Sequence, residues 1–387
     1  MSPRLARVDR MPSNHERALD ALLRRGRLRS LDAPAGIDFT SNDYLGLAQS
    51  QELADAVVAA IERGVPVGAG GSRLLRGNHP EHEALEADAA RFFGAETALF
   101  FGGGFIANTA LMATLPARGD LIVYDELIHA SVHDGMRLSK AETTAAKHND
   151  PQSIEDAIKA WRASGGVGQP WIVIESLYSM DGDRAPIDDL AQLARRHDAM
   201  LIVDEAHATG VFGPEGRGLA AHLEGSGNVI TLHTCGKALG VMGALVLAPK
   251  TIRDFLVNRA RAFIYATAPS PLVAAAVRAA LEICRKEPER REKLHRRIAF
   301  AESELKSKTR YVPPGSQIQP IIIGADASAV ALASAMKARG YDIRAIRPPT
   351  VPEGTARLRL TITLNTDEAV LSRLIADLAA AEAEIAA

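Results

Sequence analysis

Short apolar runs recur between residues 98 and 247, and segments with helical periodicity separate them. The runs cover residues 98–101, 121–124, 171–174, 201–203, 229–232 and 244–247. Continuous apolar runs of this length are typical of strands that are buried on both faces, and their alternation with helices indicates a mainly parallel sheet. The pattern therefore predicts an α/β fold with a mainly parallel central sheet and helices on both faces.

The pattern of the last hundred residues is different. Strands are expected at residues 318–323 and 357–363, with a helix at about 327–339 between them. A final helix is expected to begin at Thr366, whose hydroxyl can cap the first turn. These elements predict a smaller α+β domain at the C-terminal end.

The beginning of the chain has a pattern of its own, because residues 16–31 combine leucines with many arginines and predict a basic amphipathic helix. The chain is therefore expected to have three parts. They are an N-terminal helix and strand segment (1–45), a large α/β domain (46–285) and a small C-terminal α+β domain (286–387).

Composition excludes several classes of protein. The 387 residues include 45 Lys and Arg against 47 Asp and Glu, so the formal net charge of -2 gives no bulk attraction for nucleic acid. No apolar run approaches the ~20 residues that cross a bilayer. The two cysteines, Cys235 and Cys284, are far apart and fit a reducing compartment. Because the N-terminal residues also lack the apolar core of a secretory signal, we expect a cytoplasmic protein.

Chemically useful side chains follow two of the expected strands. Asp204 and His207 come after the run at 201–203, and Thr234 and Lys237 come after the run at 229–232. Carboxyl ends of parallel strands form one edge of a sheet, where such folds bind ligands. Small residues around Lys237 can exclude water and lower the pKa of its amine. This set suits pyridoxal phosphate, with Lys237 forming the Schiff base and Asp204 pairing with the ring nitrogen.

A glycine cluster at residues 102–104 follows the first apolar run and precedes a helix. Exposed amides at such a helix start can bind a phosphate, although a tight structural turn explains the glycines equally well. The spacing also matches a dinucleotide fingerprint, with Asp125 about 20 residues further on. A nicotinamide-dependent oxidoreductase is therefore an alternative, but it leaves Asp204 and Lys237 without a role.

Two further patterns resemble known motifs but lack the residues that would complete them. DEAH at residues 204–207 matches a helicase box, but the chain lacks the phosphate loop that this class requires. His129 and His133 are four residues apart, yet no Cys, Asp or Glu completes a zinc site, so no metal is expected. His129 instead follows the strand at 121–124, where its ring could stack on a planar cofactor.

Arg357 and Arg359 alternate along an expected strand and therefore point to the same side. One of them could bind a substrate carboxylate through paired hydrogen bonds, while the other is expected to be a solvated edge charge.

Eight motifs together resemble those of the α-oxoamine synthases, from about residue 19 to the last helix. They are SNDYLGL (41–47), GSRLLRGN (71–78), GFIANTA (104–110), HAS (129–131), SMDGD (179–183), DEAHATGVFGPEGRG (204–218), TCGKALG (234–240) and IRPPTVPEGTARLRLT (346–361). The resemblance implies a pyridoxal-phosphate-dependent acyltransferase of fold type I, the aspartate aminotransferase type. Such enzymes are usually homodimers with active sites at the subunit interface.

The resemblance also implies a role for each residue around the cofactor ring. Lys237 would carry the Schiff base, and Asp204 would keep the pyridine nitrogen protonated. His207 would bind the phenolic oxygen with Ser179 nearby, and His129 would stack on the ring.

The cofactor phosphate would be held by Thr234 and by the amides of Gly104 and Phe105. Thr267 matches a segment that reaches the phosphate of the partner subunit. Gly103 stands where a serine is more usual in the family.

For substrates, the resemblance implies that Asn42 and Arg359 bind the carboxylate of an amino acid and that Thr350 lies by an acyl chain. The segment at 346–352 favours L-alanine and a pimeloyl thioester, on coenzyme A or acyl carrier protein, as in biotin biosynthesis. The alternatives are glycine with acetyl-CoA or succinyl-CoA, and serine with a long acyl thioester.

Overall fold

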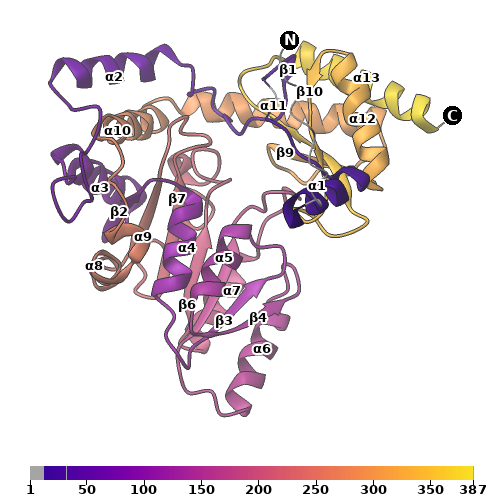
Figure 1. Cartoon of the computed structure of the whole chain (residues 1–387). Coiled ribbons are helices and arrows are strands. Elements are labelled where there is room, and N and C mark those ends of the chain that lie inside the picture. The colour runs from indigo at the N-terminus through magenta and orange to yellow at the C-terminus, as the bar shows by residue number, and fades with distance from the viewer. Residues whose placement is uncertain (1–12, 32, 387) are drawn as a thin grey trace, which may run out of the picture.

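A mixed seven-stranded sheet is the centre of the large part of the chain in the computed structural model, which describes residues 13–31 and 33–386 (Figure 1). The strand order is β2-β8-β7-β6-β5-β3-β4, and only β8 runs antiparallel to its neighbours. The strands are β2 (Thr97–Phe101), β3 (Leu121–Asp125), β4 (Glu142–Ala146), β5 (Pro170–Glu175), β6 (Met200–Asp204), β7 (Val229–Thr234) and β8 (Ala244–Ala248). The mainly parallel sheet predicted from the apolar runs is confirmed.

Helices cover both faces of this sheet, and alternate side chains of each strand face different layers. Ile122 and Ile202 pack toward one layer, whereas Val123 and Val203 pack toward the other. The first layer contains α4 (Gly104–Thr114), α5 (Ala130–Leu138), α8 (Lys250–Arg259) and α9 (Arg261–Ile264), and the second contains α6 (Pro151–Ala163) and α7 (Ile187–Arg196). Burial on both sides explains why these strands read as continuous apolar runs.

A smaller three-stranded antiparallel sheet, β11-β12-β9, lies beside the large part at the upper right of Figure 1. Its strands are β9 (Ile318–Gly324), β11 (Ala345–Ile346) and β12 (Ala356–Thr361), and its helices are α11 (Pro288–Lys308), α12 (Asp326–Ala338) and α13 (Glu368–Ala386). The chain also forms β1 (Ile37–Asp38), which pairs in parallel with β10 (Tyr341–Asp342). The N-terminal segment therefore packs with the C-terminal part.

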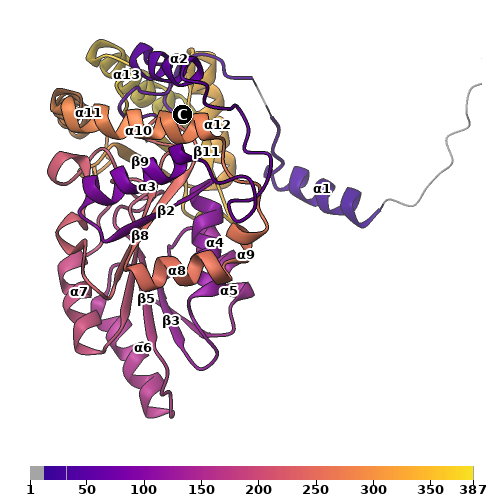
Figure 2. The same cartoon turned by 90° about the vertical axis from the view of Figure 1, so that its left-hand side faces the viewer.

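The remaining helices lie at the edge of the large sheet and at the N-terminus (Figure 2). They are α1 (Asn14–Arg24), α2 (Gln51–Glu62), α3 (Pro80–Phe93) and α10 (Pro271–Lys286). The helix predicted over residues 16–31 is too long, because α1 ends at Arg24 and Gly26 adopts a φ of 63°. The cap predicted for α13 is also wrong, since the side chain of Asp367 accepts from the Val370 amide at 2.8 Å.

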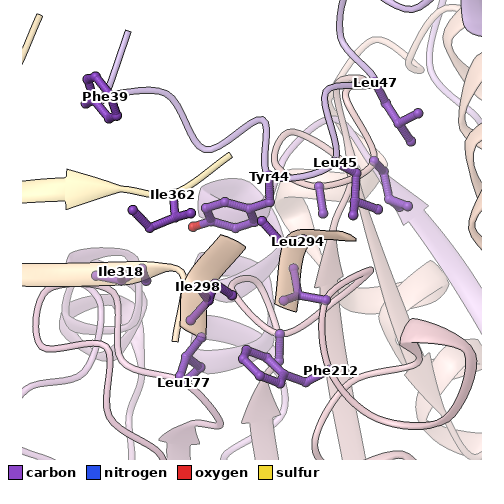
Figure 3. Close-up of a cluster of buried hydrophobic side chains, with 14 of the residues drawn as sticks. Phe39, Tyr44, Leu45, Leu47, Leu177, Phe212, Leu294, Ile298, Ile318 and Ile362 are labelled. Carbon is purple, nitrogen blue, oxygen red and sulfur yellow. The ribbon is translucent and has the colours of Figure 1, made fainter. Parts of the chain in front are cut away.

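One hydrophobic cluster joins the N-terminal segment, the large part and the C-terminal part (Figure 3). Tyr44 and Leu177 meet Leu294 of α11, Ile318 of β9 and Ile362 within this cluster. All five side chains are at most 1% exposed. The cluster fixes the C-terminal part against the carboxyl edge of the large sheet.

The part of the chain that the structure describes has no helix with the length and apolar content that a bilayer crossing demands.

The turn before β8 gives a test of the fold. Gly243 has a φ of 123°, and a Cβ there would lie 2.4 Å from a ring carbon of Phe100. Gly243→Ala should therefore destabilise the protein by about 1–3 kcal/mol, measured as a lower melting temperature. Gly236→Ala is the control, because its Cβ would meet nothing closer than 3.5 Å. Equal melting temperatures of the two variants would contradict this account.

Candidate active site

The carboxyl ends of β6 and β7 bring the predicted acid and lysine to one cavity. The strands are parallel neighbours, with Asp204 opposite Leu232, so the turns that follow them share an edge of the sheet. The cavity measures about 110 Å³ and is lined by Gly104, Phe105, Asn108, His129, Glu175, Asp204, Ala206, His207, Leu232, Thr234 and Lys237. The edge predicted from the apolar runs is thus the edge at which these side chains meet.

Asp204 is buried and held in a fixed orientation. Its Oδ2 accepts a hydrogen bond from the side-chain amide of Asn108 at 2.7 Å, and its Oδ1 accepts from the Ala206 amide at 2.9 Å. Asn108 also donates to the Ser131 hydroxyl at 3.0 Å. Sequence reasoning missed Asn108, although a polar amide in the apolar helix α4 was a usable signal.

Lys237 is half-buried on the cavity wall. Desolvation lowers the pKa of Lys237 below that of an exposed lysine, although the carboxylates of Asp204 and Glu175 oppose this shift. The amine is therefore neutral more often than an ordinary lysine at the same pH, which a nucleophile or base requires.

Glu175 is a second buried acid in the cavity and was not assigned a role from the sequence. Its Oε2 accepts from the Ser179 amide at 3.1 Å. Burial, together with the charge of Asp204, raises the pKa of Glu175 well above its usual range. Oε1 of Glu175 and Oδ1 of Asn108 are buried without a hydrogen-bond partner among the described residues. Buried oxygens of this kind normally bind a polar ligand or water, so the cavity fits a polar cofactor.

His207 contacts Tyr44, another residue that sequence reasoning left without a role. The Tyr44 hydroxyl lies 2.6 Å from Nδ1 of His207 and donates to Oδ1 of Asn42 at 3.0 Å. Burial lowers the pKa of His207 well below its usual value, and the charges of Lys237 and Arg359 add to the effect. His207 is therefore a neutral imidazole at physiological pH.

Arg359 bonds two further residues of the predicted site, Ser179 and Asn42. Its Nε donates to the Ser179 carbonyl at 2.6 Å, and its Nη2 donates to Oδ1 of Asn42 at 3.0 Å. These residues lie beside the cavity, linked to it through Tyr44 and Glu175. The neighbouring Arg357 is also buried and pairs with Asp181 at 2.6 Å. The prediction that one of the two arginines is a solvated edge charge is therefore wrong.

The amino end of α4 faces Thr234 across the cavity. A Cβ on Gly104 would lie 3.5 Å from the Thr234 hydroxyl, so the two groups are in near contact. No side chain caps this helix, which leaves the amides of its first turn available to an anion. Gly103, which replaces the usual serine, has an extended backbone that any residue adopts, with a φ of 173°.

His129 lies at the start of α5, exposed on the cavity wall, with Nδ1 at 2.8 Å from the Ser131 hydroxyl. Its ring meets Phe105 edge to face, with centroids 6.3 Å apart. Desolvation lowers the pKa of His129, and the charge of Asp204 opposes that change. Its position on the wall is compatible with stacking on a flat ring.

Thr267 and Thr350 lie away from the cavity, and both are exposed. Thr350 accepts a hydrogen bond from Arg29 at 3.3 Å. The roles expected for these two threonines remain predictions. Cys235, which follows Thr234, is buried, and burial raises the pKa of its thiol, so it is a packing residue.

Asp125, which suggested a dinucleotide-binding protein, is already hydrogen-bonded within the fold. The Asp125 carboxylate accepts from the amides of Leu127 and Asn149 at 2.9 and 2.8 Å and contacts His148, so it is not free to bind a ribose. Within the described ranges, no group of three or more His, Cys, Asp or Glu side chains could hold a metal ion.

Comparisons with known proteins identify the fold and its cofactor. The chain matches the aminotransferase class I and II family over residues 34–378. A serine palmitoyltransferase from Sphingomonas wittichii superposes with a TM-score of 0.84 at 26% identity, over 91% of this chain and 88% of that one. An SPT structure with a PLP internal aldimine gives 0.83 at 27% identity, over 91% and 88%. The fold is therefore that of fold type I pyridoxal-phosphate enzymes, and the predicted cofactor is confirmed.

Curated relatives identify the family within this fold type to which the chain belongs. The 8-amino-7-oxononanoate synthase of Chromobacterium violaceum is 40% identical over 92% of this chain and 94% of its own length. That of Anaeromyxobacter dehalogenans is 41% identical over 94% of both chains. The Francisella tularensis enzyme superposes with a TM-score of 0.77 at 28% identity, over 91% of this chain and 99% of that one. The chain therefore belongs to the 8-amino-7-oxononanoate synthase family.

The hydrogen bond between Asn108 and Asp204 can be tested through cofactor affinity. A hydrogen bond to a charged group contributes about 1.5–3 kcal/mol, so Asn108→Ala should weaken pyridoxal phosphate binding at least about tenfold. Thr109→Ala is the control on the same helix, because the Thr109 hydroxyl donates to the Ser131 carbonyl at 3.3 Å and does not line the cavity. Titration of cofactor-free protein followed by visible absorbance measures both. Equal affinities of the two variants would remove Asn108 from the site.

Proposed function

We propose that this protein joins L-alanine to a pimeloyl thioester, carried by coenzyme A or acyl carrier protein, to give 8-amino-7-oxononanoate, carbon dioxide and the free thiol. This is a carbon–carbon bond-forming acyl transfer of biotin biosynthesis. The observation that carries the proposal is the half-buried Lys237 with its lowered pKa, in one cavity with Asp204. The names of relatives at 40–41% identity support the choice of substrates.

Pyridoxal phosphate, when bound, supplies an electron-accepting ring for the carbanion formed at the alanine α-carbon. Asp204 is the carboxylate that would keep the ring nitrogen protonated, and Asn108 orients it for that contact. Lys237 would hold the cofactor before the reaction and would then, as a neutral amine, remove the α-proton of alanine at its Nζ. The lowered pKa supports both roles, since each requires an unprotonated nitrogen.

The other cavity residues would orient the cofactor. Thr234 with the amides of Gly104 and Phe105 would hold the phosphate, and the uncapped start of α4 supports this assignment. His129 would stack on the ring. His207 would bind the phenolic oxygen, supported by its contact with Tyr44.

The alanine carboxylate would bind Arg359 and Asn42. A guanidinium has five N–H donors, and Arg359 uses three of them, on Ser179, Thr361 and Asn42. Two N–H donors of Arg359 therefore remain for the alanine carboxylate. The hydroxyl of Ser179, by contrast, would lie by the phenolic oxygen of the cofactor. Thr350 would contact the acyl chain.

We also propose a cytoplasmic homodimer whose subunits share active sites. Large apolar side chains are exposed at the start of α4, Phe105 (49%) and Ile106 (42%), and in the segments 67–75 and 265–270, which hydrogen bonds join: Val67 (75%), Leu75 (80%) and Tyr265 (71%). Patches of this kind mark interaction surfaces. Thr267, two residues after Tyr265, would then reach the phosphate of the partner subunit. Both cysteines are buried and unpaired, which supports a reducing compartment.

Replacing the lysine tests the proposed chemistry. Lys237→Ala should reduce turnover of alanine and a pimeloyl thioester to below about one-thousandth of wild type, because it removes both the attachment point and the base. Bound cofactor should still be detectable in its absorbance spectrum. Lys250→Ala is the control, since Lys250 is exposed, does not line the cavity, and forms an ion pair with Asp254 at 2.6 Å. Full activity of Lys237→Ala would refute the assignment.

Substrate choice is tested by a panel of amino acids and thioesters. Alanine with pimeloyl thioester should have a higher kcat/KM than glycine or serine with acetyl-, succinyl- or palmitoyl-CoA. Release of carbon dioxide and thiol in equal amounts measures turnover. A clear preference for glycine or serine would replace the proposed function with that of another α-oxoamine synthase.

A further inference from the structure

His148 lies outside the cavity and is in contact with two carboxylates. Its Nδ1 is 2.9 and 3.1 Å from the two oxygens of Asp125, and its Nε2 is 2.8 Å from Oδ2 of Asp183. The His148 side chain is 22% exposed and that of Asp125 is 2% exposed. Each ring nitrogen thus faces an acid, an arrangement that only the doubly protonated, cationic imidazole satisfies fully.

The surroundings of His148 favour the charged form. Burial lowers its pKa, but the hydrogen bonds to Asp125 and Asp183 outweigh burial and raise the pKa to about 10. The ring of Tyr178 packs edge-on against the imidazole with centroids 4.4 Å apart, and the His148 amide donates to Glu126 at 3.1 Å. The contacts that favour the cation, the two carboxylates, therefore outweigh burial, and no Lys or Arg side chain is among these contacts.

Asp125 connects His148 to one wall of the cavity. It is the last residue of β3, and its Oδ1 accepts from the Leu127 amide at 2.9 Å while its carbonyl accepts from the Ile128 amide at 3.0 Å. These bonds fix the turn that ends at His129, which caps the amino end of α5 and lines the cavity.

Asp183 connects His148 to a loop that lies beside the cavity. Its carbonyl accepts from the Tyr178 amide at 2.9 Å, which closes the loop at residues 178–183. This loop contains Ser179, whose carbonyl accepts from Arg359, and Asp181, which pairs with Arg357. The loop therefore sets the position of the arginine proposed to bind the alanine carboxylate.

We propose that His148 is a positioning residue that holds the turn before His129 and the loop at 178–183 in fixed relation by bridging Asp125 and Asp183. Without the cation, two acids of like charge would lie close together and repel each other. Asn149 also bonds both acids, at 2.8 and 2.7 Å, but it brings no charge. This role in catalysis depends on the proposed function, because it acts through Arg359 and His129.

The test compares His148→Gln with His197→Gln in the cofactor-loaded protein. His197 is a matched control, since it is 20% exposed and lies 2.9 Å from Glu155, between α6 and α7. His148→Gln should raise the KM for L-alanine roughly tenfold, a loss of about 1.4 kcal/mol. The KM for the pimeloyl thioester should change less than twofold, and the visible circular dichroism of the bound cofactor should change through His129. His197→Gln should resemble wild type in all three measurements.

A double-mutant comparison distinguishes loss of the bridge from a general loss of stability. It uses Asp183→Asn and the double variant His148→Gln/Asp183→Asn. If the two side chains act as a pair, the double variant should have no higher alanine KM than His148→Gln alone. Additive effects would overturn the proposal, and so would an unchanged alanine KM in His148→Gln.

Hydrogen exchange gives a readout that does not depend on the reaction. His148→Gln should exchange faster than wild type at residues 126–130 and 178–183, and unchanged exchange there would overturn the proposal. If wild-type protein prefers glycine or serine, the proposed function fails, but the bridge is still tested by the KM for that amino acid and by exchange.

Discussion

The site depends on two groups of opposite charge that line one cavity, the Asp204 carboxylate and the Lys237 amine. A buried carboxylate such as Asp204 is costly unless hydrogen bonds and a nearby positive charge compensate it. The amides of Asn108 and Ala206 and the amine of Lys237 provide that compensation. In return, desolvation makes the amine easier to deprotonate. The parallel pairing of β6 and β7 is what brings these groups to one edge of the sheet.

The C-terminal part adds the substrate side of the site. Strand β12 places Arg359 beside the cavity, in hydrogen-bond contact with Ser179 and Asn42. The shared hydrophobic cluster around Tyr44 holds that strand against the large sheet (Figure 3). The Tyr44 ring is packed in the cluster while its hydroxyl contacts His207 and Asn42. The packing of the two parts is therefore directly coupled to the geometry proposed for amino acid binding.

The sequence was sufficient for features that depend on local patterns. Apolar runs identified six of the seven sheet strands, and the residues after two of them identified Asp204 and Lys237. Edge strand β4, with its sequence ETTAA, was missed because four of its five residues are exposed and carry no apolar signal. Asn108 and His148 were missed as functional candidates because their partners come from other segments, and only the folded chain brings those together.

The central claim is that the Lys237 amine forms the covalent link to pyridoxal phosphate. Borohydride reduction of the purified protein, followed by digestion and mass spectrometry of the peptides, tests it most directly. The account expects a phosphopyridoxyl group on the peptide containing Lys237. Finding that group on another lysine, or finding cofactor bound with no lysine modified, would contradict it.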